Sequence, residues 1–138
     1  MNDTEATKFL ALVKVAYPMA YKDVDTETLV ATVNMWSREY KNVPYPIMEM
    51  ALDRFKKHSK FPPTIAEINE ELRSIYYKAA EDAFVAKEFG MREVFEKSRA
   101  IMEYTFPYKS EQTSFAIDYG RMKALGNGAD MLTEGGEV

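Results

Sequence analysis

Apolar residues recur every three or four positions along most of this chain, a spacing that predicts α-helices with one buried face. Three such segments come first, and breaks that contain proline separate them. We expect the first helix to begin at Asn2, whose side chain forms a capping box with Glu5, and to end before Pro18. Its apolar stripe comprises Ala6, Phe9, Leu10, Val13 and Tyr17.

The second and third helices follow the same pattern. The second is expected to start at Asp25, and its stripe comprises Leu29, Val33, Trp36 and Tyr40, with Val30 beside them. Trp36, the only tryptophan, lies on this stripe, which favours a core anchor over a base-stacking platform. Pro46 suits the first position of the third helix, whose stripe comprises Ile47, Ala51, Leu52 and Phe55, with Met48 beside them. Three short amphipathic helices with short connections predict a compact bundle of about 60 residues.

The sequence Phe-Pro-Pro-Thr-Ile-Ala-Glu-Ile, which starts at Phe61, combines a helix stop with a helix start. Pro62 and Pro63 lack backbone donors and disfavour the α region for the residue before each, so no helix passes through them. Thr64 and Glu67 then form a second capping box. We expect a rigid corner between two helices, with the Phe61 ring buried inside it.

A long fourth helix is expected from Thr64 to about Gly90, because neither proline nor glycine interrupts that stretch. Its stripe comprises Ile65, Ile68, Leu72, Ile75, Tyr76, Ala79, Ala83 and Ala86. The bulky first half should cap the bundle. Beyond Lys78, small alanines stand among charges, so the helix should project beyond the bundle or pair with another helix. The pattern is helical again over residues 91–104.

The last part of the chain predicts one more helix and a tail. The helical pattern resumes from Ser110 to Leu125, whereas the residues from Gly126 onward hold four glycines and no periodicity, which predicts disorder. The expected fold is therefore all-α, with a small N-terminal bundle, the Phe-Pro-Pro corner, a long fourth helix, further C-terminal helices and a disordered tail. The expected parts are a bundle platform over residues 1–75, a helical C-terminal arm over 76–125 as the candidate partner-binding region, and the tail over 126–138.

Composition and charge narrow the class of protein. The 138 residues suffice for one modest core, and the absence of cysteine excludes disulfides, thiolate catalysis and cysteine-based metal sites. No apolar run approaches the ~20 residues of a membrane span and no signal pattern is present, so we expect a soluble, cytoplasmic protein. A net charge of −4 argues against a protein that mainly grips duplex DNA. The basic cluster of Lys56, Lys57 and Lys60 is either a solvated complement to a helix C-terminus or a small nucleic-acid contact.

Catalytic chemistry finds little support in the sequence. His58, the only histidine, lies in a lysine-rich polar run, and neither a phosphate-cradling glycine loop nor a zinc-type histidine pair is present. Glu67 and Glu71 could chelate an ion together with Glu70, but an exposed acidic helix face is the commoner explanation. We expect no enzyme, no catalytic residue, no metal site and no cofactor.

Binding is better supported, because methionine and aromatic residues are frequent after residue 83. Exposed, such side chains suit the grooves of a partner; packed back on the bundle, they would form a second core layer. The candidate anchors flank the break at Pro107, where side chains are least expected to be fully buried. These candidate partner-binding residues are Phe106, Tyr108, Phe115 and Tyr119.

Several motifs of the first half, in this order, resemble the phage replicative-helicase loader/inhibitor family of tailed phages of Gram-positive hosts. The matching features are a helix ending in Ala16-Tyr17-Pro18, a helix bearing Trp36, a helix containing Ala51-Leu52, and then Phe61-Pro62-Pro63-Thr64-Ile65 followed by Glu67. The resemblance implies a non-enzymatic adaptor in the bacterial host cell. Such an adaptor binds the hexameric replicative helicase, restrains its ATPase and unwinding, and delivers it to an origin-bound initiator.

In that family the N-terminal half is a folded platform, and a more flexible C-terminal half makes much of the helicase contact. This chain departs from the pattern because its C-terminal half reads as largely helical. Two alternatives stay open. One is a DNA-binding replication or transcription accessory protein that uses the second and third helices like a helix-turn-helix. The other is a structural homodimer that pairs through the fourth helix.

Overall fold

The computed structural model describes residues 1–110, and all the regular structure in that range is helical. The helices are α1 (Asp3–Ala16), α2 (Thr26–Glu39), α3 (Tyr45–Lys56), α4 (Ile65–Glu88) and α5 (Arg92–Thr105), followed by the 3-10 turn η1 (Phe106–Tyr108). The all-α prediction is therefore confirmed. The helix expected from Ser110 to Leu125 and the tail from Gly126 lie outside the described residues.

The predicted helix starts are present with their capping contacts. The Glu5 amide donates to Asn2 Oδ1 at 2.8 Å, and the Asn2 amide donates to Glu5 Oε1 at 2.9 Å. Asp25 caps α2 by accepting from the Thr28 amide at 2.7 Å. In α3 the start differs by one residue from the prediction, because Pro44 is the N-cap and Pro46 occupies the second helical position.

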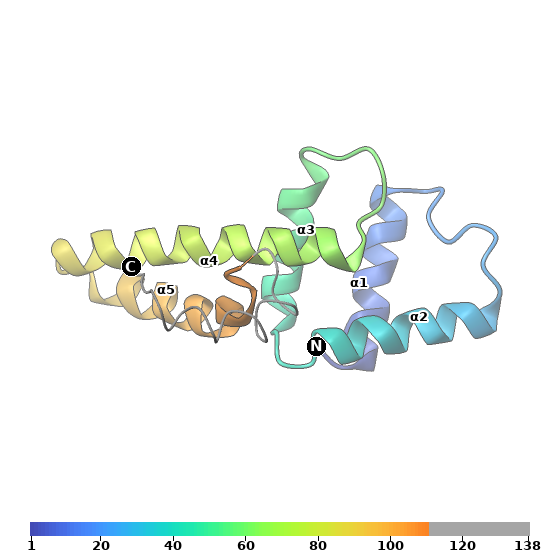
Figure 1. The fold of residues 1–138 in the computed structure, drawn as a ribbon, viewed down its shortest axis with the longest axis horizontal. Helices are drawn as coiled ribbons and strands as arrows, with labels where there is room; N and C mark the ends of the chain where they lie inside the picture. The colour runs from blue at the N-terminus through green and yellow to red at the C-terminus, as the bar shows by residue number, and fades with distance from the viewer. Residues whose placement is uncertain (111–138) are drawn as a thin grey trace, which may run out of the picture.

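The core lies among α1, α2, α3 and the first half of α4. Trp36 is buried in it, with its ring centroid 5.3 Å from that of Phe9 and 5.7 Å from that of Tyr40, which confirms the predicted core anchor. Leu29 and Val30 remain exposed, contrary to the expected stripe, because the N-terminal turns of α2 extend past α1 (Figure 1). Across the described residues, no helix is long and apolar enough to cross a membrane.

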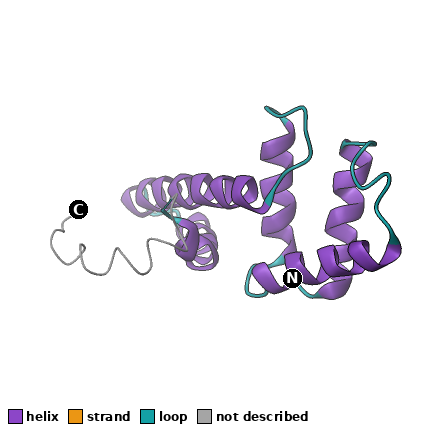
Figure 2. Ribbon diagram, turned by 45° about the vertical axis from the view of Figure 1, so that its right-hand side comes forward, coloured by secondary structure: helices purple, strands orange, loops and turns teal. Residues whose placement is uncertain are grey.

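Helices α4 and α5 form a hairpin that projects from the bundle, as the views in Figures 1 and 2 both show. The two expected alternatives for the fourth helix are both realised, since it projects and also pairs with α5 of its own chain. The contact face of α4 carries the buried residues Ala79, Ala83 and Ala86. Small side chains allow the two helices to approach closely, and on α5 Ser98 is buried in return.

A Schellman motif turns the chain between α4 and α5. Gly90 has a φ of 66°, the left-handed conformation that glycine adopts without a Cβ clash. The Met91 amide donates to the Ala86 carbonyl at 2.8 Å, and the Gly90 amide donates to the Lys87 carbonyl at 3.3 Å. These bonds satisfy the last carbonyls of α4 and set the direction in which α5 returns to the bundle. We refer to α4 from residue 76, α5 and η1 together as the arm.

Candidate functional site

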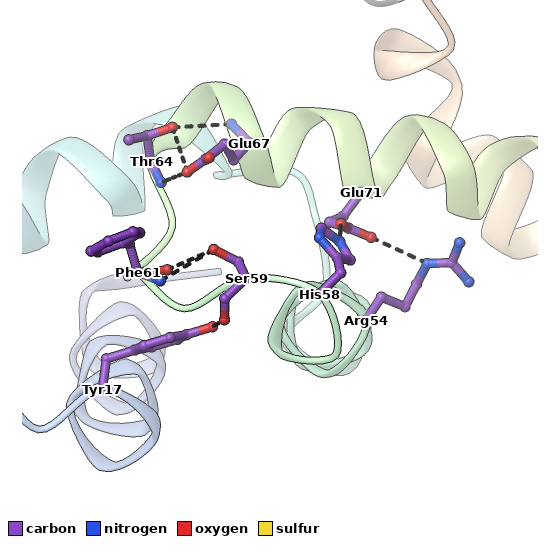
Figure 3. Close-up of polar contacts among 8 residues, drawn as sticks. All are labelled: Tyr17, Arg54, His58, Ser59, Phe61, Thr64, Glu67 and Glu71. Atoms are coloured by element: carbon purple, nitrogen blue, oxygen red, sulfur yellow. Dashed lines mark hydrogen bonds and ion pairs between the residues drawn. The ribbon is translucent and has the colours of Figure 1, made fainter.

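The corner before α4 is held by Tyr17 and by a capping box (Figure 3). The Tyr17 hydroxyl donates to the Ser59 carbonyl at 2.9 Å, and its ring meets Phe55 edge-on at 6.3 Å between centroids. The Glu67 amide donates to Thr64 Oγ1 at 3.2 Å, while the Thr64 amide donates to Glu67 Oε1 at 3.0 Å. The predicted capping box is confirmed, and the loop after α3 is fastened to the end of α1.

The expectation of a buried Phe61 ring is wrong, because its side chain is 75 % exposed. Ser59 forms a tight local turn with Phe61: the Phe61 amide donates to Ser59 Oγ at 3.3 Å, and Ser59 Oγ donates to the Phe61 carbonyl at 3.1 Å. At this corner Tyr17 and Pro63 are the buried residues instead. The fold therefore uses the backbone of Phe61 and leaves its ring in solvent, as it also leaves Pro18.

A buried carboxylate joins α3 to α4 (Figure 3). Glu71 accepts a hydrogen bond from His58 Nε2 at 2.6 Å, and Arg54 Nε lies 3.4 Å from its other carboxylate oxygen. The Arg54 contact lacks hydrogen-bond geometry, so it acts as an ion pair. The expected exposed acidic face is thus wrong for Glu71, since burying a carboxylate requires such partners. Within residues 1–110, no group of acidic residues and histidine is arranged to hold a metal ion.

Large apolar side chains gather in solvent at the free end of the arm, around the turn between α4 and α5. Phe84 is 68 % exposed and Phe89 is 75 % exposed. We define the tip surface as the exposed residues Phe84, Val85, Phe89, Met91 and Val94. All five lie within residues 84–94, next to the hairpin turn, and exposed apolar side chains concentrated in one place mark interaction sites more often than scattered ones do. The tip surface is therefore the candidate contact site of the arm.

The four candidate anchors from the sequence are placed differently. Phe106 is 54 % exposed, with its ring against Tyr76 at 6.1 Å between centroids. Tyr108 is only 8 % exposed, so the expectation that it stands free is wrong. The turn η1 folds it back onto the bundle, where its ring lies 6.1 Å from that of Tyr40. Phe115 and Tyr119 lie outside the described residues.

The sequence pattern of α4 also indicates the tip residues, although none of them is among the predicted anchors. Ala79, Ala83 and Ala86 define the inward face of the second half of α4. Phe84 and Phe89 do not lie on that stripe, so both rings must point elsewhere. A large aromatic residue off the buried stripe of a projecting helix is a candidate for surface recognition.

The described chain is a helical bundle with a tightly fastened corner and a projecting hairpin. Its first half, residues 1–69, matches the family model for the N-terminal domain of the phage gene 39 protein. Because the match spans half of the 138 residues, the chain belongs to this family of phage helicase loader/inhibitor proteins, as the motifs of its first half suggested. It is, at the family level, a helicase-associated protein of phage DNA replication. The comparisons with curated proteins and with solved structures returned no match.

Proposed function

We propose that this protein is a non-enzymatic adaptor that binds the hexameric replicative helicase through its arm. Bound there, it inhibits ATP hydrolysis and unwinding, and it delivers the helicase to the origin-bound initiator. Family membership supports a helicase as partner. The observation that carries the choice of surface is the tip surface, with Phe84 and Phe89 in solvent at the end of a projecting hairpin.

The division of labour follows the expected parts. In this proposal residues 1–75 serve as the platform and residues 76–125 as the partner-binding region, of which the arm is the part that the structure describes. Helix α4 belongs to both, because it runs without a break from the corner into the arm. A rigid helix of this kind positions the tip surface relative to the bundle, so that contact at the tip also orients the whole protein on the helicase.

The chemistry of the arm suits a protein partner. Apolar side chains at its tip supply area for insertion into a groove, since aromatic residues dominate the energetics of interfaces. Charges flank them on both helices, with Glu88 before Phe89 and Arg92 and Glu93 after Met91. Such a polar surround selects among partners and speeds association more than it raises affinity.

The experiment is an inhibition titration with the full chain and the cognate helicase. The double variant Phe84→Ser/Phe89→Ser should lose most of its inhibition of the helicase ATPase, while its thermal melt stays close to that of the wild type because both rings are exposed. The control is Val30→Ser, which removes an exposed apolar side chain from α2. Full inhibition by the double variant would place the helicase contact elsewhere.

A further inference from the structure

Two loops that are far apart in the sequence meet at one end of the bundle. The loop after α1 and the loop after α3 both start at the upper ends of their helices in Figure 1. Between them is a groove of about 740 Å³, lined by residues 16–20 on one side and by Lys56 and residues 59–62 on the other. The motif Ala16-Tyr17-Pro18 and the start of the Phe-Pro-Pro motif, Phe61-Pro62, thus come together in one concave surface.

The floor of this groove is fixed and its rim is apolar. Tyr17 is buried in the floor and is held by its bond to the Ser59 carbonyl. On the rim, Met19 is 71 % exposed and Phe61 is 75 % exposed. Because Tyr17, Pro63 and the capping box of Thr64 and Glu67 already hold the corner, the fold does not need these two side chains.

The charged residues that line the groove are all positive. Lys56 and Lys60 are among the lining residues, and no lining residue is acidic. Of the nearby carboxylates, Asp53 lies 3.3 Å from Lys56 in an exposed ion pair, which a carboxylate of the incoming segment would replace, and Glu67 is engaged in the capping box. Burial raises the pKa of the Tyr17 hydroxyl; the charge of Lys56 acts against that rise and the charge of Glu67 adds to it, so charges of both signs act on the floor of the groove.

We propose that this groove binds an acidic segment of a partner protein, which inserts a large apolar side chain between Met19 and Phe61 and places carboxylates on Lys56 and Lys60. An aromatic ring and a methionine on the rim suit such an insertion, since methionine adapts its shape to the group that enters. The inference does not depend on what the arm binds. It gives the protein a second contact surface, separate from the tip surface, with which it holds two partners at once.

The test begins with a selection from a random dodecamer library displayed on phage, with the full chain as bait. The selected sequences should place Asp or Glu beside Phe, Leu or Trp, and the synthetic peptides should shift the amide resonances of residues 16–20 and 59–62. Phe61→Ser and the double variant Lys56→Glu/Lys60→Glu should each weaken peptide binding at least tenfold. Phe89→Ser, with a ring of equal exposure on the tip surface, should leave binding unchanged.

A charge swap distinguishes specific binding in the groove from non-specific peptide binding. Peptides in which Asp and Glu are replaced by Lys should lose binding to the wild type and regain it on the double variant with two glutamates. Selection of basic peptides, failure to select any peptide, or resonance shifts confined to other surfaces would overturn the proposal. So would contacts between the Met19 methyl group and residues 111–138 in the free chain, because the groove would then be filled by the chain itself.

Discussion

Tyr108 closes the core against Tyr40, with ring centroids 6.1 Å apart, although the two residues are far apart in the chain. The Tyr108 hydroxyl also donates to the Glu39 carbonyl at 3.4 Å. The end of the arm is therefore fastened to the end of α2. The arm leaves the bundle through α4 and returns to it through η1. It is therefore attached to the bundle at both ends.

Removal of the Tyr108 ring should destabilise the whole protein. Tyr108→Ala deletes a buried aromatic side chain and leaves a cavity next to Tyr40, which costs roughly 3 kcal/mol of unfolding free energy. Phe106→Ala, two residues away and largely exposed, should cost less than about 1 kcal/mol. Urea denaturation of both variants checks this. Equal stabilities would show that η1 is not docked on the bundle.

The burial of Tyr108 against Tyr40 also predicts that the free energy of unfolding falls at alkaline pH. Burial, assisted by the charge of Glu39, raises the pKa of Tyr108 to about 12, and burial also raises the pKa of Tyr40. An unfolded tyrosine ionises near pH ~10, so the stabilisation from neutral Tyr108 is complete below that pH and is lost as the pH rises towards about 12. Unfolding free energies measured across this range should fall less steeply for Tyr108→Phe. A folded-state pKa of Tyr108 close to its ordinary value would contradict this prediction.

At the corner, the Thr64 cap should contribute to the free energy of unfolding and the Phe61 ring should not. Thr64→Ala should cost roughly 1 kcal/mol, because the Glu67 amide at the start of α4 loses its acceptor. Phe61→Ala should change the unfolding free energy by no more than about 0.5 kcal/mol, since its ring is in solvent. Thermal or urea melts of the two variants distinguish these roles. A large loss for Phe61→Ala would mean that the ring packs in solution.

Nucleic acid is not expected to be the main partner. The net charge is −4, and the basic cluster of Lys56, Lys57 and Lys60 stands near Asp53, which pairs with Lys56 at 3.3 Å. Anisotropy titrations at physiological salt should show only weak binding to duplex or single-stranded DNA. Sub-micromolar affinity that disappears when the three lysines are neutralised would favour the DNA-binding alternative instead.

Capping and periodicity rules predicted most of the helices from the sequence. They failed where contacts between distant residues determine whether a side chain is buried. Capping boxes at Asn2 and Thr64, and the alanine stripe of α4, depend on neighbours within a few positions, so the sequence reveals them. Phe61 and Tyr108 both stand beside prolines, and for each the predicted exposure is wrong. Whether such a ring is buried depends on a partner far along the chain, as Tyr40 is for Tyr108, and periodicity carries no information about that partner.

Contacts with another helix also explain why the prediction of an exposed Glu71 is wrong. Glu71 lies on α4, and its acidic neighbours suggested a solvated face. Its burial depends on Arg54 and His58 at the end of α3, which only the crossing of the two helices brings within 3.4 Å and 2.6 Å. The tip surface, by contrast, could have been predicted, because Phe84 and Phe89 lie off the alanine stripe.

The central claim, that the arm carries the helicase contact, is tested most directly by two matched substitutions. Phe89 on the tip surface and Phe61 at the corner are each 75 % exposed, so replacement of either by serine removes a comparable exposed ring. The measurement is the Kd of each full-length variant for the cognate hexameric helicase. Phe89→Ser should weaken binding by roughly 1–3 kcal/mol, as expected for an interface hot spot, and Phe61→Ser should bind like the wild type. Undiminished binding by Phe89→Ser together with a loss for Phe61→Ser would contradict the account and move the helicase contact to the bundle.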